Sequence, residues 1–184
     1  AVYAVPGVWS LGVVSAVAPH AGEYFLTTID QRHHSGPFDI IGDVHGCADE
    51  LEALLKDLGY AVSWSGIGAE RSCSVTAPYG RCAIFVGDLV DRGPRTPDAL
   101  RIVMRMAEAG SALCVPGNHD VKFLRWLTGG KPHVANGLAQ SIAQIETETQ
   151  AFRDEVAAFL SSLPVYLHLV GGDLVVSHAG LRED

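Results

Sequence analysis

Basic residues are few in this chain, and so are cysteines and uninterrupted apolar runs. Lys and Arg total 13 against 21 Asp and Glu, which gives a formal net charge of −8. An acidic chain binds nucleic acid or anionic membranes poorly through charge alone. If the substrate carries phosphate, something other than the net charge of the protein must attract it.

The spacing of the cysteines argues against two common uses of cysteine, metal binding and disulfide cross-linking. No two of them form a Cys-x-x-Cys pair, which argues against a thiolate zinc site and a disulfide framework; they are Cys47, Cys73, Cys82 and Cys114. Cys82 and Cys114 stand in apolar runs and are expected to be buried as small apolar residues. Scattered reduced thiols favour a cytoplasmic location.

The first 21 residues have no charged side chain, but glycine and proline interrupt them too often for a membrane span of about 20 apolar residues. No basic segment precedes them, as one would in a signal peptide. We expect residues 1–36 to be a tail or linker from a preceding domain. Residues 37–184 are expected to form one domain with its own core and no membrane association.

From residue 38 onward, short apolar runs alternate with helical periodicity. The predicted strands are 38–41, 82–86, 112–115, 165–170 and 173–177. The predicted helices are 51–58, 96–110, 121–127, 138–145 and 152–160. The segment 63–79, rich in serine and glycine, is expected to be an exposed loop or hairpin. This order of elements predicts a layered α/β fold.

Polar residues follow four of these strands directly. The motifs are Gly42-Asp43-Val44-His45-Gly46, Gly87-Asp88-Leu89-Val90-Asp91-Arg92-Gly93, Gly117-Asn118-His119-Asp120 and Ser177-His178-Ala179-Gly180. Ligands of open α/β sheets bind beyond the carboxyl ends of the strands. Four such ends that each carry Asp, Asn or His indicate one shared site.

The side chains in these motifs suit a metal site. Asp43 and His45 are two residues apart, so on extended backbone they point the same way. Asp88 is a hard oxygen ligand that can bridge two ions, while Asn118 and His178 supply an oxygen and a nitrogen. Oxygen and nitrogen ligands without thiolate suit Mn, Fe or Zn. Two ions about 3.5–4 Å apart clamp a phosphoryl group and provide the positive charge that the chain lacks.

The four motifs resemble the signature blocks of calcineurin-like metallophosphoesterases, over residues 38–181. The resemblance implies a layered sandwich with a central mixed sheet flanked by helices. It implies two divalent ions, manganese first and Fe, Ni or Zn as alternatives, with a hydroxide held between them as nucleophile. Asp43, His45 and Asp88 would hold the first ion, and Asp88, Asn118 and His178 the second.

The same resemblance implies roles for the residues beside the ligands. His119 would be the general acid that protonates the leaving oxygen, and Asp91 would orient it. Arg92 would bind the phosphate, together with Asn118.

Finer features favour one branch of the family. Protein Ser/Thr phosphatases carry Gly-Asn-His-Glu, whereas this chain has Asp120. The segment 115–125, followed by Gly137-Leu138, is similar to the phosphatase module of bacterial polynucleotide kinase-phosphatases, and 29–38 looks like their linker. We therefore expect hydrolysis of RNA 3′-phosphate or 2′,3′-cyclic phosphate ends, with a kinase domain upstream and further domains downstream. Diadenosine-tetraphosphate hydrolase-like phosphatases and Ser/Thr protein phosphatases are the alternatives.

The sequence departs from the family at one point. Members usually carry a further metal-binding histidine downstream of the block that contains His178, and only six residues follow it here. We therefore expect a domain that is truncated at its C-terminus, with a second metal site one ligand short. A catalytically impaired, metal-binding fragment is the alternative from another functional class.

Overall fold

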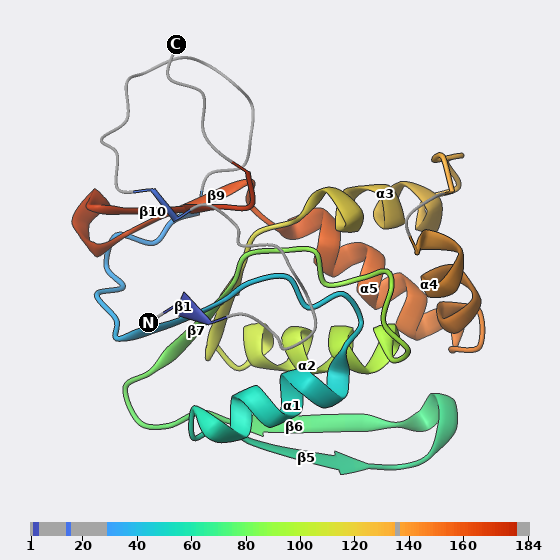
Figure 1. The fold of residues 1–184 in the computed structure, drawn as a ribbon, viewed down its shortest axis with the longest axis horizontal. Coiled ribbons are helices and arrows are strands. Elements are labelled where there is room, and N and C mark those ends of the chain that lie inside the picture. The colour runs from blue at the N-terminus through green and yellow to red at the C-terminus, as the bar shows by residue number, and fades with distance from the viewer. Residues whose placement is uncertain (1, 4–13, 16–28, 135–136, 180–184) are drawn as a thin grey trace.

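The computed structural model describes residues 2–3, 14–15, 29–134 and 137–179 (Figure 1). The helices are α1 (Ala48–Asp57), α2 (Thr96–Glu108), α3 (Asn118–Leu127), α4 (Leu138–Ile145) and α5 (Gln150–Ser162), with 3-10 turns η1 (Gly68–Glu70) and η2 (Val170–Gly172). No helix in this described part of the chain is long and apolar enough to cross a membrane.

Four parallel strands form the first sheet. Their order is β1 (Val2–Tyr3), β4 (Phe38–Ile41), β7 (Cys82–Phe85) and β8 (Ala112–Cys114). Every residue of β7 is buried, as expected for a parallel strand covered on both faces. Cys82 and Cys114 are buried in this sheet, as predicted.

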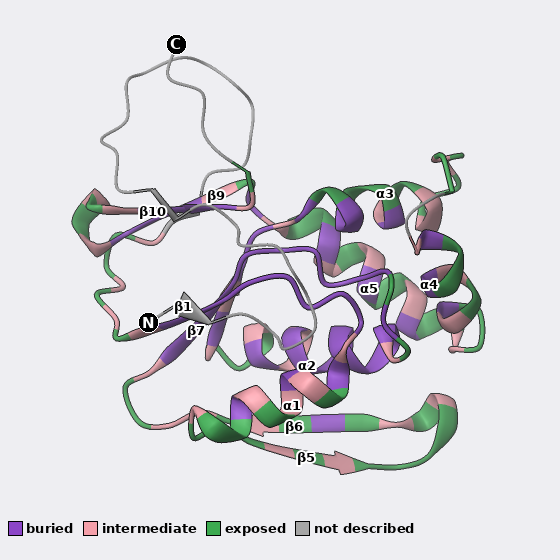
Figure 2. Ribbon diagram, viewed as in Figure 1, coloured by how far each residue is buried: buried purple, intermediate pink, exposed green. Residues whose placement is uncertain are grey.

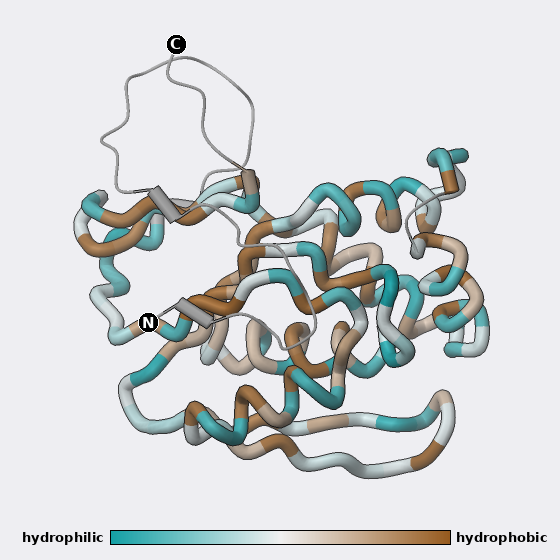
Figure 3. Tube along the Cα trace, viewed as in Figure 1, coloured by the Kyte–Doolittle hydropathy of each residue, from teal (hydrophilic) through white to brown (hydrophobic). Residues whose placement is uncertain are grey.

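A second, mixed sheet packs on one face of the first. Its order is β2 (Val14–Ser15), β10 (Leu174–Ser177), β9 (Tyr166–Leu169) and β3 (Ile29–Asp30). Side chains of both sheets share one apolar cluster, made of Ile40, Ile84, Val86, Val115, Leu167, Leu169 and Val176. Figure 3 shows hydrophobic residues gathered on the central strands of both sheets. The expected 1–36 tail falls mostly outside the described residues; its described parts are these short strands and residues 31–36.

Helices cover the other face of the parallel sheet and complete the layers. Helix α2 buries Leu100, Val103 and Met106, and α5 buries Val156 and Leu160 in the same core. The predicted α/β layered fold is confirmed, and the five strands predicted from the sequence are divided between two sheets. Helix α3 begins three residues earlier than the sequence predicts, at Asn118.

The segment predicted as a loop or hairpin is an antiparallel hairpin, formed by β5 (Ala61–Ser65) and β6 (Ser72–Thr76). It lies against α1 and α2 (Figure 1). The guanidinium of Arg71 stacks on the Trp64 ring at 4.6 Å and also pairs with Asp98 of α2 at 2.9 Å. The ion pair fixes the hairpin to the first turn of α2.

The loops at the carboxyl ends of β4 and β7 are buried as deeply as the strands. Figure 2 shows the buried colour continuing from both strands into the loops. The amides of Val44 and His45 donate to the carbonyl of Asp88 at 3.1 and 2.8 Å, and Gly93 donates to the carbonyl of His45 at 2.8 Å. The two loops therefore form one rigid platform.

Close backbone contact at this platform requires glycine. Gly87 has φ +90°, and a Cβ there would overlap the backbone nitrogen of Gly117. A Cβ on Gly117 would in turn overlap the carboxylate of Asp88. Glycine at these positions lets the loops after β7 and β8 touch.

We predict that Gly87→Ala destabilises the protein much more than Gly110→Ala. Both glycines are left-handed, but a methyl group added at Gly110 (φ +70°) would have nothing within 4 Å of it. The left-handed conformation costs alanine about 1–2 kcal/mol in each variant, and the overlap at Gly87 adds about 1–3 kcal/mol. Urea unfolding measures the difference. Equal midpoints for the two variants would show that the loops do not touch as described.

Candidate metal centre

Three imidazole rings converge on one carboxylate oxygen. The Nε2 atoms of His178, His45 and His119 lie 3.6, 3.8 and 4.0 Å from Oδ2 of Asp88. Asp43 Oδ2 lies 3.5 Å from His45 Nε2, and Asn118 Oδ1 lies 3.3 Å from His178 Nε2. The fold therefore brings together all five metal ligands predicted from the sequence.

Hydrogen bonds to the backbone aim two of these imidazoles at the centre. Nδ1 of His45 is 2.8 Å from the carbonyl of Val90, and Nδ1 of His178 is 2.7 Å from the carbonyl of Val86. A carbonyl can only accept, so Nδ1 carries the proton and Nε2 keeps its lone pair. Such second contacts are what orient metal-bound histidines.

The donor atoms fit divalent ions. Ligand bonds of about 2.0–2.2 Å place neighbouring ligands about 3–3.5 Å apart, close to the separations found here. Nε2 of His45 is buried without a hydrogen-bond partner among the described residues, which is costly for a polar atom unless a cation takes its lone pair. Two groups of potential ligands share Asp88: Asp43, Asp88 and His178, and His45, Asp88 and His119.

The charge of the site also calls for cations. Asp43, Asp88 and Asp91 are all buried, in the loops after β4 and β7. Burial lowers the pKa of His45, but Asp43 and the carbonyl of Val90 outweigh that effect and raise the pKa above its ordinary value. The surroundings therefore favour positive charge at this position.

Asp88 is held by its backbone and by helix α3. Its φ is +50°, a conformation that non-glycine residues rarely adopt, and the amides of Val44 and His45 fix its carbonyl. The amide of His119, in the first turn of α3, donates to Oδ1 of Asp88 at 3.0 Å. Oδ2 is left to face the imidazoles.

Asp120 has a structural role in the site that the sequence did not reveal. In the sequence it served only to distinguish this chain from Ser/Thr phosphatases. Its buried carboxylate accepts from the amides of Leu89 at 2.9 Å and Gly117 at 2.8 Å, which ties the loops after β7 and β8 together. Burial raises its pKa to about 7, against the effect of these hydrogen bonds. The signal for it was the three-residue spacing from Gly117, typical of an acid that caps a helix start.

His119 and Asp91 form a buried pair. Nδ1 of His119 lies 2.6 Å from Oδ2 of Asp91. An ionised carboxylate can only accept, so Nδ1 carries the proton and Nε2 faces Asp88. That nitrogen is placed either to ligate an ion or to exchange a proton with a bound phosphate.

Two predicted substrate-binding residues lie at the solvent side of the buried acids. Asn118 and Arg92 are exposed, and Arg92 has φ +65°. Within the described residues, Arg92 makes no hydrogen bond or ion pair, although its charge acts on His45 and lowers the pKa of that side chain. These two exposed residues form a rim that is open to an anionic substrate, beside the buried carboxylates and imidazoles.

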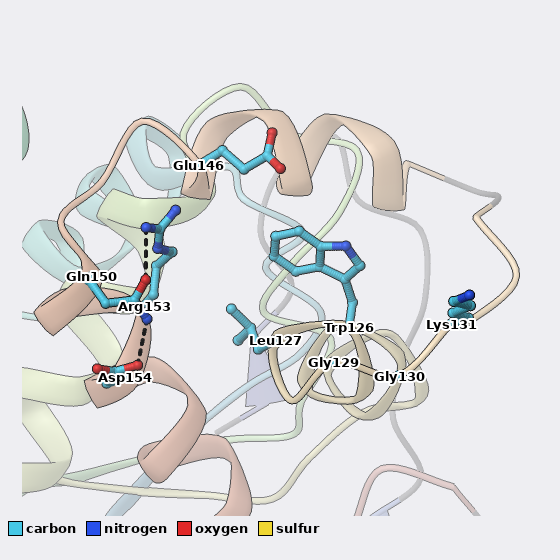
Figure 4. Close-up of a pocket in the computed structure, with 9 residues that line it drawn as sticks. All are labelled: Trp126, Leu127, Gly129, Gly130, Lys131, Glu146, Gln150, Arg153 and Asp154. Carbon is cyan, nitrogen blue, oxygen red and sulfur yellow. Dashed lines mark hydrogen bonds between the residues drawn. The ribbon is translucent and has the colours of Figure 1, made fainter.

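A separate open cavity of about 490 Å³ lies at the far end of α3 (Figure 4). Trp126, Leu127 and Lys131 line one side, and Arg153, bonded to Gln150, lines the other. None of the predicted site residues lines it, and about 12 Å of helix separates Trp126 from Asn118. The chemistry lies at the strand ends.

Residues 36–182 match the family model of calcineurin-like phosphoesterases. Over 151 residues the chain is 41% identical to a bis(5′-nucleosyl)-tetraphosphatase (asymmetrical) of Halalkalibacterium halodurans, covering 80% of this chain and 58% of the relative. It is 37% identical to the protein of that name from Bacillus subtilis, covering 80% and 59%. The chain thus spans less than two thirds of the length of these relatives.

Solved structures agree with the fold. A crystal structure described as a candidate diadenosine tetraphosphatase aligns with TM-score 0.59 and 25% identity, over 85% of this chain and 56% of the other. A protein serine/threonine phosphatase from Saccharomyces cerevisiae aligns with TM-score 0.52 and 16% identity, over 78% and 39%, and shows the fold alone.

The relatives correct the branch expected from the sequence. They are tetraphosphatases, the first alternative above, and not polynucleotide kinase-phosphatases. The similarity of segment 115–125 did not distinguish the two branches, because both are close relatives within one family. With the family model matched along residues 36–182 and a tetraphosphatase 41% identical, this chain belongs to the calcineurin-like phosphoesterase family.

Proposed function

We propose that this protein hydrolyses dinucleoside tetraphosphates asymmetrically, to a nucleoside triphosphate and a nucleoside monophosphate. The observation that carries the proposal is the convergence of three imidazoles on Asp88 in a chain 41% identical to a tetraphosphatase. A polyphosphate needs concentrated positive charge, which an acidic chain supplies through cations.

The proposed ligands are divided as the resemblance implies. Asp43, His45 and Asp88 hold one ion, and Asp88, Asn118 and His178 the other, with manganese as the first candidate. When bound, such ions polarise the phosphoryl oxygens and make water a competent nucleophile at neutral pH. The protein residues fix the ligand directions through Val86, Val90 and the start of α3.

The remaining residues bind the substrate and handle the proton. Arg92 and Asn118 contact the phosphate from the exposed rim. Water adds its oxygen to phosphorus and loses a proton to solvent, the bridging P–O bond breaks, and His119, protonated on both ring nitrogens, gives the proton of Nε2 to the departing bridge oxygen. Asp91 holds the ring by accepting from Nδ1.

The proposed location is the cytoplasm. All four cysteines are free and three of them are buried, which supports a reducing compartment in which nucleotides are present.

The substrate assignment is tested by comparing diadenosine tetraphosphate, an RNA oligonucleotide with a 3′-phosphate and a phosphoserine peptide at equal concentration with Mn²⁺. We expect ATP and AMP to form at least about tenfold faster than phosphate leaves the other two. Asp88→Asn controls for contaminating activity. Faster release from the RNA end would reinstate the polynucleotide branch, and two bound Mn²⁺ without turnover would indicate an impaired fragment.

Asp88→Asn should reduce the Mn²⁺ retained after dialysis, because the amide cannot bridge two ions as a carboxylate does. We expect two equivalents per chain before the change and at most one after it, measured by elemental analysis. Asp173→Asn, at an exposed carboxylate, is the matched control and should retain both. Two equivalents of Mn²⁺ retained by Asp88→Asn would show that Asp88 does not bridge the two ions.

His119→Ala separates the two roles open to this residue. As general acid, its loss should lower kcat about 100-fold while Mn²⁺ content stays unchanged. His133→Ala, an exposed histidine, should leave both unchanged. If Mn²⁺ is lost from His119→Ala, the residue is a ligand together with His45 and Asp88.

A further inference from the structure

We propose that Ser141 and Gln144 of helix α4 are positioning residues, which hold Asp91 and Arg92 in the conformation that hydrolysis requires. The inference rests on the proposed function, because Asp91 is taken to orient the general acid. It concerns two polar side chains that no motif of the sequence includes.

The turn that carries Asp91 and Arg92 is strained. Both residues have positive φ, +74° and +65°, in consecutive positions. Residues with a side chain adopt this region rarely, so such a pair persists only where its surroundings hold it. The contacts that hold it come from the loop after β4, through the carbonyls of His45 and Gly46, and from helix α4.

Ser141 contacts this turn directly. Its hydroxyl accepts from the amide of Asp91 at 2.8 Å, and it shares a second hydrogen bond of 3.1 Å with the hydroxyl of Thr96. Ser141 and Asp91 are both fully buried, so water cannot replace the lost partner in a variant. The bond therefore fixes the peptide group that precedes the Asp91 side chain.

Gln144 fixes the other end of the loop. Its Oε1 accepts from the amide of Thr96 at 2.7 Å, and its Nε2 donates to the carbonyl of Gly93 at 2.9 Å. One side-chain amide thus satisfies a donor and an acceptor of the loop backbone at once. Arg92 lies between the two anchored ends.

Gly137, immediately before α4, completes the contact. With φ +97°, it lies so close that a Cβ would overlap the backbone nitrogen of Arg92. Gly137, Ser141 and Gln144 are spaced by four and three residues, so they share one face of the helix. The whole face is directed at the segment from Asp91 to Thr96.

The conformation of this turn decides where Asp91 and Arg92 lie in the site. The carboxylate of Asp91 meets His119 at 2.6 Å only while its backbone is held, and the exposed Arg92 side chain starts from the same strained turn. Releasing the turn should misplace the acid and the phosphate-binding cation, while the carboxylate of Asp88 and the imidazole of His178 stay held by their own bonds to the backbone. Helix α4 therefore holds the turn that carries Asp91, the partner of the general acid, and Arg92, the phosphate-binding residue.

The test compares Ser141→Ala and Gln144→Leu with Val156→Ala, which removes buried volume in α5 and matches a loss of stability without touching the loop. Rates are measured on phenyl phosphate, whose basic leaving group needs a proton, and on p-nitrophenyl phosphate, which needs one far less. Ser141→Ala and Gln144→Leu should each lose about tenfold in kcat on phenyl phosphate and less than about threefold on p-nitrophenyl phosphate. Val156→Ala should lower both rates equally.

A second readout does not need turnover. In NMR spectra of ¹⁵N-histidine-labelled protein, the short bond to Asp91 should place the Nδ1 proton of His119 far downfield, and Ser141→Ala should move or remove that resonance. Equal rate losses on both esters, or an unchanged resonance in Ser141→Ala, would overturn the inference. An inactive wild-type chain would instead count against the proposed function, and the resonance alone would then decide the role of Ser141.

Discussion

The structure depends on burying several carboxylates where three strands end. Desolvating one carboxylate without compensation costs several kcal/mol, and Asp43, Asp88, Asp91 and Asp120 are all buried there. Backbone amides compensate Asp88 and Asp120, and His119 compensates Asp91. What remains is a set of oxygen and imidazole atoms that face one another around Oδ2 of Asp88. Divalent cations, which the family implies, would complete that balance, so the same charges that oppose folding favour metal binding.

The scaffold around these charges is built from contacts that leave little room for adjustment. The loops after β4 and β7 exchange backbone hydrogen bonds, and the loops after β7 and β8 touch through Gly87 and Gly117. Helix α4 then adds side-chain hydrogen bonds to the segment from Asp91 to Thr96, which the loop after β4 also holds through backbone bonds to Gly93 and Arg95. The proposed metal ligands thus come from the strand ends, whereas the position of the proposed acid–base pair also depends on helix α4. This division suggests how metal binding and catalysis can be affected separately by substitution.

The strand-end motifs made much of the site predictable, because a ligand placed directly after an apolar strand must lie at the sheet edge. Asp43, His45, Asp88, Asn118 and His178 met as expected. Ser141 and Gln144 were not predictable, because polar residues spaced by three on a helix are typical of a solvated face. The start of α3 was also missed, because its first turn is stabilised by Asp120 bonding back to Gly117 rather than by apolar periodicity. The relatives favour the tetraphosphatase alternative over the expected polynucleotide branch. The motifs could not separate the two, because they report the metal centre, which related branches share.

Anomalous X-ray diffraction from crystals grown with Mn²⁺ tests the central claim most directly. The account predicts two peaks about 3.5–4 Å apart on either side of Asp88, one beside Asp43 and His45 and the other beside Asn118 and His178. His119 should remain bonded to Asp91 and ligate neither ion. A single peak, or a peak bonded to Nε2 of His119, would contradict the account.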